Sequence, residues 1–253
     1  MLKLATQDSH PSSHISFASN HSCATTTDGQ DPRPFTSFTR ITNPLNGEEV
    51  VESRLWPDHC VQNTKGEELV QGIDWRHLTH IDDNIMSELN RLYPVPRKGA
   101  EEHLGFRYAA LPSSDLAIFK KGLVPTLEQY SAFTPPFTNP PIHPPPSHSQ
   151  SQNEQAETRP PPLLTRLLQA YAVTHVYVVG LAYDYCVKET ALDAVRQAFV
   201  TYVVEEGTRA VDGSTASLNL VKAELRAGGV NILEGDLDGI EEIKWVKNLY
   251  LPG

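Results

Sequence analysis

The C-terminal third of the chain alternates between short β-branched runs and amphipathic stretches, and this alternation constrains the fold more than any other feature. Apolar residues recur at helical spacing in three segments, and three short apolar runs between them are typical of strands. The expected helices cover residues 163–171, 187–198 and 218–225, and the expected strands cover residues 175–180, 200–204 and 230–233. Strands that alternate with helices favour a parallel sheet with helices on both faces, so the predicted fold class is α/β.

The rest of the chain gives fewer elements. Residues 116–119 indicate a strand, residues 83–92 indicate a helix, and Leu2–Ala5 has the pattern of a strand end whose beginning is missing. A chain of 253 residues can enclose one α/β core of good size but is too short to promise two. Residues 1–253 are therefore predicted to form a single domain.

Two stretches are predicted to be loop insertions in that domain. Residues 134–162 hold half of the chain's 20 prolines and almost no aliphatic residues, so they offer little apolar surface to offset their ordering entropy. Residues 19–47 are a weaker case, rich in Thr, Asp, Asn and Pro.

The composition excludes several classes of function. A formal net charge of −10 argues against nucleic acid as a partner, because phosphate binding requires a basic surface. The longest apolar stretch, residues 176–182, is far shorter than the roughly 20 residues that span a bilayer, and the first ten residues do not form a signal peptide. Three cysteines without a Cys-x-x-Cys pair favour neither a disulfide framework nor a zinc ribbon. These features predict a protein of a reducing compartment, the cytoplasm with the nucleus as an alternative, and no membrane partner.

Cys186 is the candidate nucleophile. It follows an apolar strand and precedes a helical pattern, where free backbone N–H groups and the helix dipole favour a thiolate and an oxyanion. Lys121 ends another apolar run, and its ammonium group beside the sulfur would lower the pKa of the thiol. The alternatives are a small buried cysteine at a strand–helix junction and a solvated lysine at a strand end.

Asp8 and His10 are the candidate metal ligands. Separated by one residue, they point to the same side of an extended segment, and a further histidine such as His59 would complete a three-ligand site with open positions. Ten histidines in the chain make such a pair weak evidence alone, and a polar loop is the alternative. Trp56 and Tyr130 are either core aromatics or the walls of a pocket for a flat ring.

The order of these segments is more specific than any one of them. The segments 7–17, 56–64, 121–133 and 180–188 closely resemble those of nicotinamidases, also called pyrazinamidases, in the isochorismatase-like cysteine hydrolase family. The resemblance implies a three-layer αβα fold with a mainly parallel sheet. It also implies hydrolysis of nicotinamide to nicotinate and ammonia, a step of NAD salvage. Isochorismatases and carbamoyl-amide hydrolases fit less well, because the former lack both the cysteine and the metal set and the latter usually lack the metal motif.

The resemblance also assigns roles to the residues named above. It makes Cys186 the nucleophile that forms a thioester, Lys121 its charge partner, and the N–H groups of Ala182 and Cys186 the oxyanion hole, with a cis peptide before Ala182. In the family's pattern, the residues that match the ligands of a divalent metal are Asp8, His10 and His59. The metal is expected to be zinc, with iron and manganese as alternatives. Trp56 and Tyr130 match positions that flank the pyridine ring of nicotinamide, and the resemblance leaves homo-oligomer formation open.

One departure from the family bears on activity. The family carries a catalytic aspartate at the end of a first strand upstream of the metal motif, whereas only seven residues precede Asp8 here and none is acidic. That aspartate is the general base of the family, and its strand lies inside the sheet. The second hypothesis is therefore a truncated, inactive chain that at most binds metal or nicotinamide. A smaller departure is Ser9, where nicotinamidases commonly have tryptophan.

Overall fold

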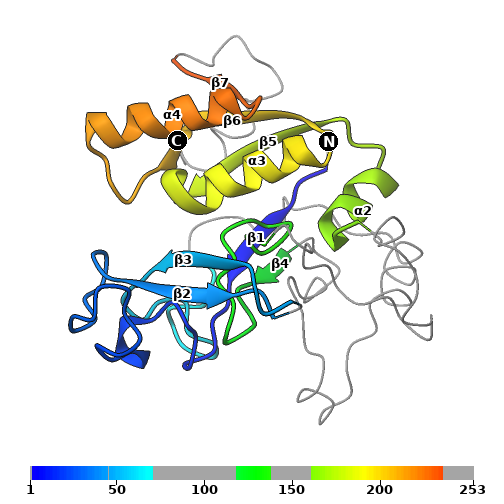
Figure 1. The fold of residues 1–253 in the computed structure, drawn as a ribbon. Coiled ribbons are helices and arrows are strands. Elements are labelled where there is room, and N and C mark those ends of the chain that lie inside the picture. The colour runs from blue at the N-terminus through cyan, green and yellow to red at the C-terminus, as the bar shows by residue number, and fades with distance from the viewer. Residues whose placement is uncertain (1, 45, 71–117, 138–160, 236–253) are drawn as a thin grey trace, which may run out of the picture.

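Parallel strands dominate the structure, a computed structural model that describes residues 2–44, 46–70, 118–137 and 161–235 (Figure 1). Strands β5 (His175–Leu181), β6 (Val200–Arg209) and β7 (Asn231–Leu233) form one parallel sheet in that order. Strand β1 (Ala5–Asp8) pairs in parallel with β4 (Ile118–Lys121). The predicted α/β class with mainly parallel strands is confirmed.

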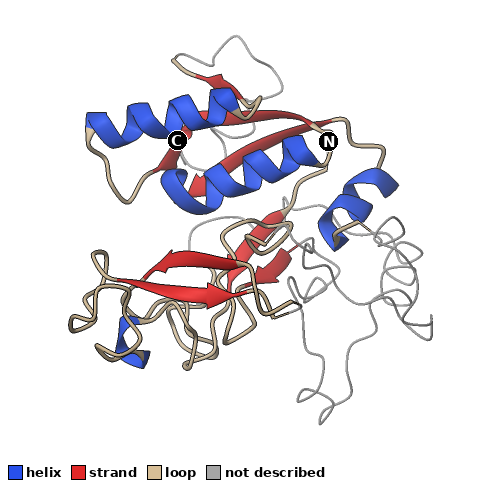
Figure 2. Ribbon diagram, viewed as in Figure 1, coloured by secondary structure: helices blue, strands red, loops and turns tan. Residues whose placement is uncertain are grey.

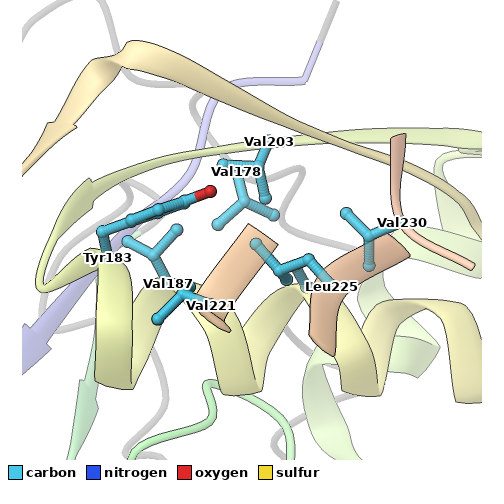
Figure 3. Packing of buried hydrophobic residues seen from close by; sticks show 8 residues of the cluster. Val178, Tyr183, Val187, Val203, Val221, Leu225 and Val230 are labelled. Atoms are coloured by element: carbon cyan, nitrogen blue, oxygen red, sulfur yellow. The ribbon is translucent and has the colours of Figure 1, made fainter. Parts of the chain in front are cut away.

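Helices α3 (Lys188–Arg196) and α4 (Thr215–Ala227) cover one face of the β5–β6–β7 sheet (Figure 2). Their apolar faces meet the inward side chains of β5 and β6 in one buried cluster, part of which is drawn in Figure 3. The cluster consists of Val178, Tyr183, Val187, Ala191, Val203, Val221, Leu225 and Val230. The helical members are spaced four residues apart, at Val187 and Ala191 and at Val221 and Leu225, and on β5 the partly buried Val176 lies two residues before Val178. These spacings are why local periodicity predicted both kinds of element.

Local signals set the ends of α4 and its distance from α3. The Ser214 side chain accepts a hydrogen bond from the backbone N–H of Ser217 at 3.3 Å and caps the first turn. At the other end, a Cβ placed on Gly228 would lie 2.2 Å from Cδ2 of Leu192, so a larger residue there would require the Leu192 side chain to move. Helix α2 (Leu163–Ala170) packs separately, with Leu164 and Leu168 in a second apolar cluster.

An antiparallel hairpin occupies part of the stretch that was predicted to be a loop. Strand β2 (Phe38–Thr42) pairs with β3 (Val50–Arg54), so a loop covering all of residues 19–47 is wrong. Ile41 is fully buried against Leu127 and Phe137, which anchors the hairpin to the domain. Whether the segment is an insertion stays a prediction.

The first residues of the other predicted insertion, 134–162, pack within the domain. Phe137 is buried, and the Thr134 hydroxyl donates a hydrogen bond to the Asp193 carboxylate at 3.2 Å, so residues 134–137 belong to the packed domain. Residues 138–160, like the helix predicted at 83–92, lie outside the described residues.

The two parallel sheets each have an open edge among the described residues. β1 pairs only with β4, and β5 pairs only with β6. The strand predicted to end at Ala5 instead begins there, while Leu2 and Leu4 pack against the cluster around Phe133. The expectation that the family's first strand is missing stays a prediction. Within the described segments, no helix is long and apolar enough to cross a membrane.

Candidate active site

The ends of β1 and β4 bring the first chemical groups together. Asp8 is the last residue of β1 and stands in register with Lys121, the last residue of β4. Two residues after Asp8, the backbone of His10 bonds to the segment of His59, because the His10 N–H donates to the Cys60 carbonyl at 2.9 Å. The ligand atoms of Asp8, His10 and His59 consequently lie within 4.8 Å of one another.

Backbone carbonyls fix the tautomers of both histidines. Nδ1 of His10 lies 3.0 Å from the Gly122 carbonyl, and Nδ1 of His59 lies 2.8 Å from the Pro57 carbonyl. A carbonyl can only accept, so each neutral ring carries its proton on Nδ1 and keeps the Nε2 lone pair for a ligand. Two imidazole nitrogens and a carboxylate that converge in this way fit a divalent ion such as zinc, with positions left for water or substrate.

Electrostatics keep Asp8 and His10 in the protonation states that a metal requires. Burial lowers the pKa of His10 to about 4, so its ring is neutral at physiological pH. Burial alone would raise the pKa of Asp8, but the Lys121 ammonium outweighs it and holds that pKa below its ordinary value. The carboxylate is therefore ionised.

Lys121 connects this cluster to the cysteine. Its ammonium group is buried and has three partners: an ion pair with the Asp8 carboxylate, the Gln129 carbonyl at 3.1 Å and Sγ of Cys186 at 3.3 Å. Three acceptors use all three N–H donors of a lysine. The structure thus brings the predicted nucleophile, its predicted charge partner and one predicted metal ligand into one contiguous group.

The Cys186 thiol does not have the lowered pKa that the sequence predicted. Burial raises its pKa to about 11, and the attraction of Lys121 offsets this only in part. The reason is that Lys121 shares its charge with Asp8, whose carboxylate itself disfavours a nearby thiolate. The predicted depression is therefore wrong for this state of the protein.

Cys186 lies on a tight turn between β5 and α3, as predicted. The turn is the π-helical segment Tyr183–Val187, and the peptide bond between Leu181 and Ala182 is cis, which confirms the expectation. The Ala182 carbonyl accepts the N–H groups of Tyr185 at 3.1 Å and of Val187 at 3.0 Å, on either side of the Cys186 amide. Ala182 and Cys186 are thus held on one short turn, and their role as an oxyanion hole stays a prediction.

The turn is anchored from behind by Asp184. Its carboxylate accepts the backbone N–H groups of Val211 at 2.9 Å and Asp212 at 3.0 Å, so it points away from the sulfur, as expected. Asp58 is exposed and also takes no part in the cluster, because its carboxylate accepts a hydrogen bond from the Ser19 hydroxyl. Neither carboxylate replaces the acid that the family's pattern places beside the cysteine.

An aromatic group stands next to these polar residues. The Trp56 indole donates a hydrogen bond to the Tyr130 hydroxyl at 2.9 Å, so the two predicted ring-binding residues are in contact. Trp56 also lies edge-on to His59, with ring centroids 6.4 Å apart, which places it beside the candidate metal ligands. Tyr185, which the sequence did not single out, lies 4.7 Å from Trp56 and 5.3 Å from Tyr130 between ring centroids.

Two other contributors were missed from the sequence. Glu67 accepts hydrogen bonds from the Ser9 hydroxyl and the Lys120 ammonium, each at 2.6 Å, and so accounts for the polar residue at position 9. Gly122 supplies the carbonyl that orients His10. Gly122 follows Lys121 directly and was visible as a motif residue, whereas Glu67 lies in a polar loop that carries no sequence signal.

Comparison with known proteins agrees with this arrangement. Residues 162–232 match the model of the Isochorismatase domain. The nicotinamidase of Saccharomyces cerevisiae is 28% identical over 231 residues, which cover 91% of this chain and 78% of the relative. The nicotinamidase of Escherichia coli is 27% identical over 229 residues, which cover 90% of this chain and 73% of the relative.

Solved structures give the same relationship. The yeast nicotinamidase bound to the inhibitor nicotinaldehyde superposes with a TM-score of 0.59 at 27% identity, covering 92% of this chain and 79% of that one. The Acinetobacter baumannii nicotinamidase/pyrazinamidase superposes with a TM-score of 0.53 at 27% identity, covering 90% and 75%. The chain is thus similar to the nicotinamidases over about nine-tenths of its length, and its mainly parallel α/β fold is that of their solved structures.

Proposed function

We propose that this chain is an amidohydrolase that converts nicotinamide to nicotinate and ammonia, a step of NAD salvage. The observation that supports it best is that Lys121 and Trp56 connect the cysteine, the candidate metal ligands and the aromatic group by direct contacts. Lys121 contacts both Cys186 and Asp8, and Trp56 stands between the histidine cluster and two tyrosines. Similarity to nicotinamidases in sequence and in structure supports the choice of substrate.

The substrate's ring is assigned to the aromatic group and the candidate metal site. Trp56 and Tyr130 offer flat apolar surface at the ring's edges, and their mutual hydrogen bond keeps their orientation fixed. A divalent ion held by Asp8, His10 and His59 would supply a Lewis-acid contact for the pyridine nitrogen. Zinc suits a set of one carboxylate and two imidazoles, and iron and manganese are the alternatives.

Cys186 is assigned the covalent chemistry. Its sulfur attacks the amide carbon, and the backbone N–H groups of Ala182 and Cys186 stabilise the negative charge that develops on the oxygen. The C–N bond then breaks, the thiol proton leaves with ammonia, and water hydrolyses the thioester to release nicotinate. Lys121 keeps a positive charge 3.3 Å from the sulfur throughout.

Ammonia release from nicotinamide tests this function. The chain with bound zinc should release ammonia, Cys186→Ala should abolish the release, and Cys23→Ser should not change it, because Cys23 is an exposed cysteine outside the proposed set of catalytic residues. A second arm carries a carboxylate-bearing strand fused to the N-terminus. Turnover in the fused version alone would support the truncated-chain hypothesis. Unchanged turnover in Cys186→Ala would refute the nucleophile, and no turnover in either version would refute the activity.

A further inference from the structure

The surroundings of His10 hold more polar groups than a metal ligand alone requires. His10 and His14 are both fully buried, and their ring centroids lie 4.2 Å apart. His10 also meets the backbone of Gly122. The ring is thus in contact with a second histidine and a glycine, neither of which the proposed reaction uses.

Gly122 contacts His10 in two ways. Its carbonyl accepts the Nδ1 proton of His10 at 3.0 Å. Its own Cα is so close that an added Cβ would lie 2.3 Å from Cε1 and 2.5 Å from Nδ1 of the ring. Gly122 also has a φ of 69°, in the left-handed region that favours glycine. No other residue could keep both the carbonyl and the ring in place.

His14 uses both of its ring nitrogens inside the protein. Nε2 lies 3.0 Å from the Leu127 carbonyl, so it carries the proton, and Nδ1 then accepts from the Ser16 hydroxyl at 2.7 Å. The Ser16 backbone N–H also points to Nδ1, at 3.3 Å. His14 therefore has the opposite tautomer to the two candidate ligands. Its one lone pair is already used by Ser16, so none is free to bind a metal.

A buried carboxyl group completes this network. Glu128 is 4% exposed, and its side chain accepts the Gln129 N–H at 2.8 Å and contacts the Ser16 hydroxyl. It is therefore linked through Ser16 to His14, and the ring of His14 packs on His10. Buried, fully bonded networks of this kind restrict the rotation of the rings they contain.

We propose that Gly122 and His14 are positioning residues that fix the ring and the tautomer of His10, and that His14 is not itself a metal ligand. The inference rests on the metal site of the proposed function. Residues that contact a metal-binding histidine, but not the metal, commonly act in this way: they accept the hydrogen bond of the second ring N–H and set the ring's orientation.

Nitrogen-15 NMR of labelled histidines tests the tautomers without any metal. In the metal-free protein, His10 and His59 should show a protonated Nδ1 and an unprotonated Nε2, and His14 should show the reverse. Addition of zinc should then shift the Nε2 signals of His10 and His59 and leave both nitrogens of His14 unchanged. A His10 ring protonated on Nε2, or a His14 signal that shifts on direct zinc binding, would overturn the proposal.

Gly122→Ala and Gly29→Ala form a matched pair of variants. The two glycines have φ values of 69° and 68°, but a Cβ at Gly29 would meet nothing within 4 Å. Both substitutions therefore carry the same backbone cost, and only Gly122→Ala displaces His10. The affinity for Co²⁺, measured by titration of its visible absorption, should fall about 10–100-fold in Gly122→Ala and stay unchanged in Gly29→Ala.

The two measurements separate the proposal from the function on which it rests. If the wild-type chain binds Co²⁺ and Gly122→Ala binds it equally well, the positioning role is wrong and the metal site stands. If the wild-type chain binds no metal, the metal part of the proposed function fails. The tautomer of His10 in Gly122→Ala then decides the positioning role alone, since loss of the Nδ1-protonated form would support it and retention would contradict it.

Discussion

Alkylation of Cys186 is the most direct test of the electrostatics around the sulfur. The pKa of its thiol is raised to about 11, whereas a cysteine in a model peptide has a pKa of about 8.5. A difference of about 2.5 units leaves roughly 300-fold less thiolate at neutral pH. The more basic thiolate is about tenfold more nucleophilic, so the net rate should be about 30-fold lower for Cys186 than for a model cysteine peptide.

The shape of the pH profile distinguishes the effect of the thiol pKa from the effect of restricted reagent access. Burial slows any reagent by a constant factor, but only the pKa sets where the rate stops rising. Iodoacetamide labelling of the metal-free protein is followed by peptide mass spectrometry and compared with labelling of a model cysteine peptide, which should reach a plateau above pH 9. Labelling of Cys186 should still rise about tenfold per pH unit at pH 10, as a thiol with a raised pKa requires. Circular dichroism at each pH controls for unfolding.

Replacement of Lys121 by an uncharged residue provides a second test of the same electrostatics. Lys121→Met keeps most of the side-chain volume but removes the ammonium group 3.3 Å from the sulfur and leaves Asp8 unbalanced. Both effects disfavour the thiolate, so labelling of Cys186 at pH 9 should slow further while labelling of Cys23 stays constant. A Cys186 profile that reaches its plateau below pH 8 would refute the reasoning, because it would show that Lys121 and the turn outweigh burial.

Three further predictions concern stability. The Tyr183 hydroxyl is buried with no hydrogen-bond partner among the described residues, so Tyr183→Phe should raise the free energy of unfolding by about 1 kcal/mol in urea titrations. Asp184→Ala removes the acceptor of two backbone N–H groups and should cost about 3 kcal/mol in the same titration, with a loss of activity larger than the loss of folded protein. Deletion of residues 138–159 should leave the thermal midpoint and the turnover nearly unchanged, and a markedly lower midpoint would show that this proline-rich stretch packs on the domain.

Sequence periodicity was sufficient to predict a helix or strand where the elements that pack against it lie nearby in the chain. The helix expected at 218–225 extends from Thr215 to Ala227, and the strand expected at 175–180 ends one residue later. Strand β6 was predicted to end at Val204 but continues to Arg209, because its register with β5 shifts after Val178. A bulge of this kind depends on the neighbouring strand and leaves no periodic signal.

The β2–β3 hairpin and the balance of charges around Cys186 could be identified only from the three-dimensional structure. Strand β2 has a polar sequence in which only alternate side chains, such as Ile41, are buried, and its partner β3 supplies the rest of the pattern. The sign of the pKa shift at Cys186 was missed because the sequence does not show how strongly burial acts on the sulfur. Nor does it show that Asp8 pairs with the ammonium group of Lys121.

Asp8 makes the candidate metal site and the cysteine parts of one electrostatic unit. Its carboxylate converges with His10 and His59 and also forms the ion pair with Lys121, so any change at Asp8 alters both the ligand set and the charge beside the sulfur. An Asp8 variant without activity would therefore not identify which role was lost. Nδ1 of His59 bonds to the Pro57 carbonyl, so this hydrogen bond does not involve the ion pair between Asp8 and Lys121. Substitution of His59 removes one ligand while the ion pair remains, which makes it the position that separates metal binding from thiol chemistry.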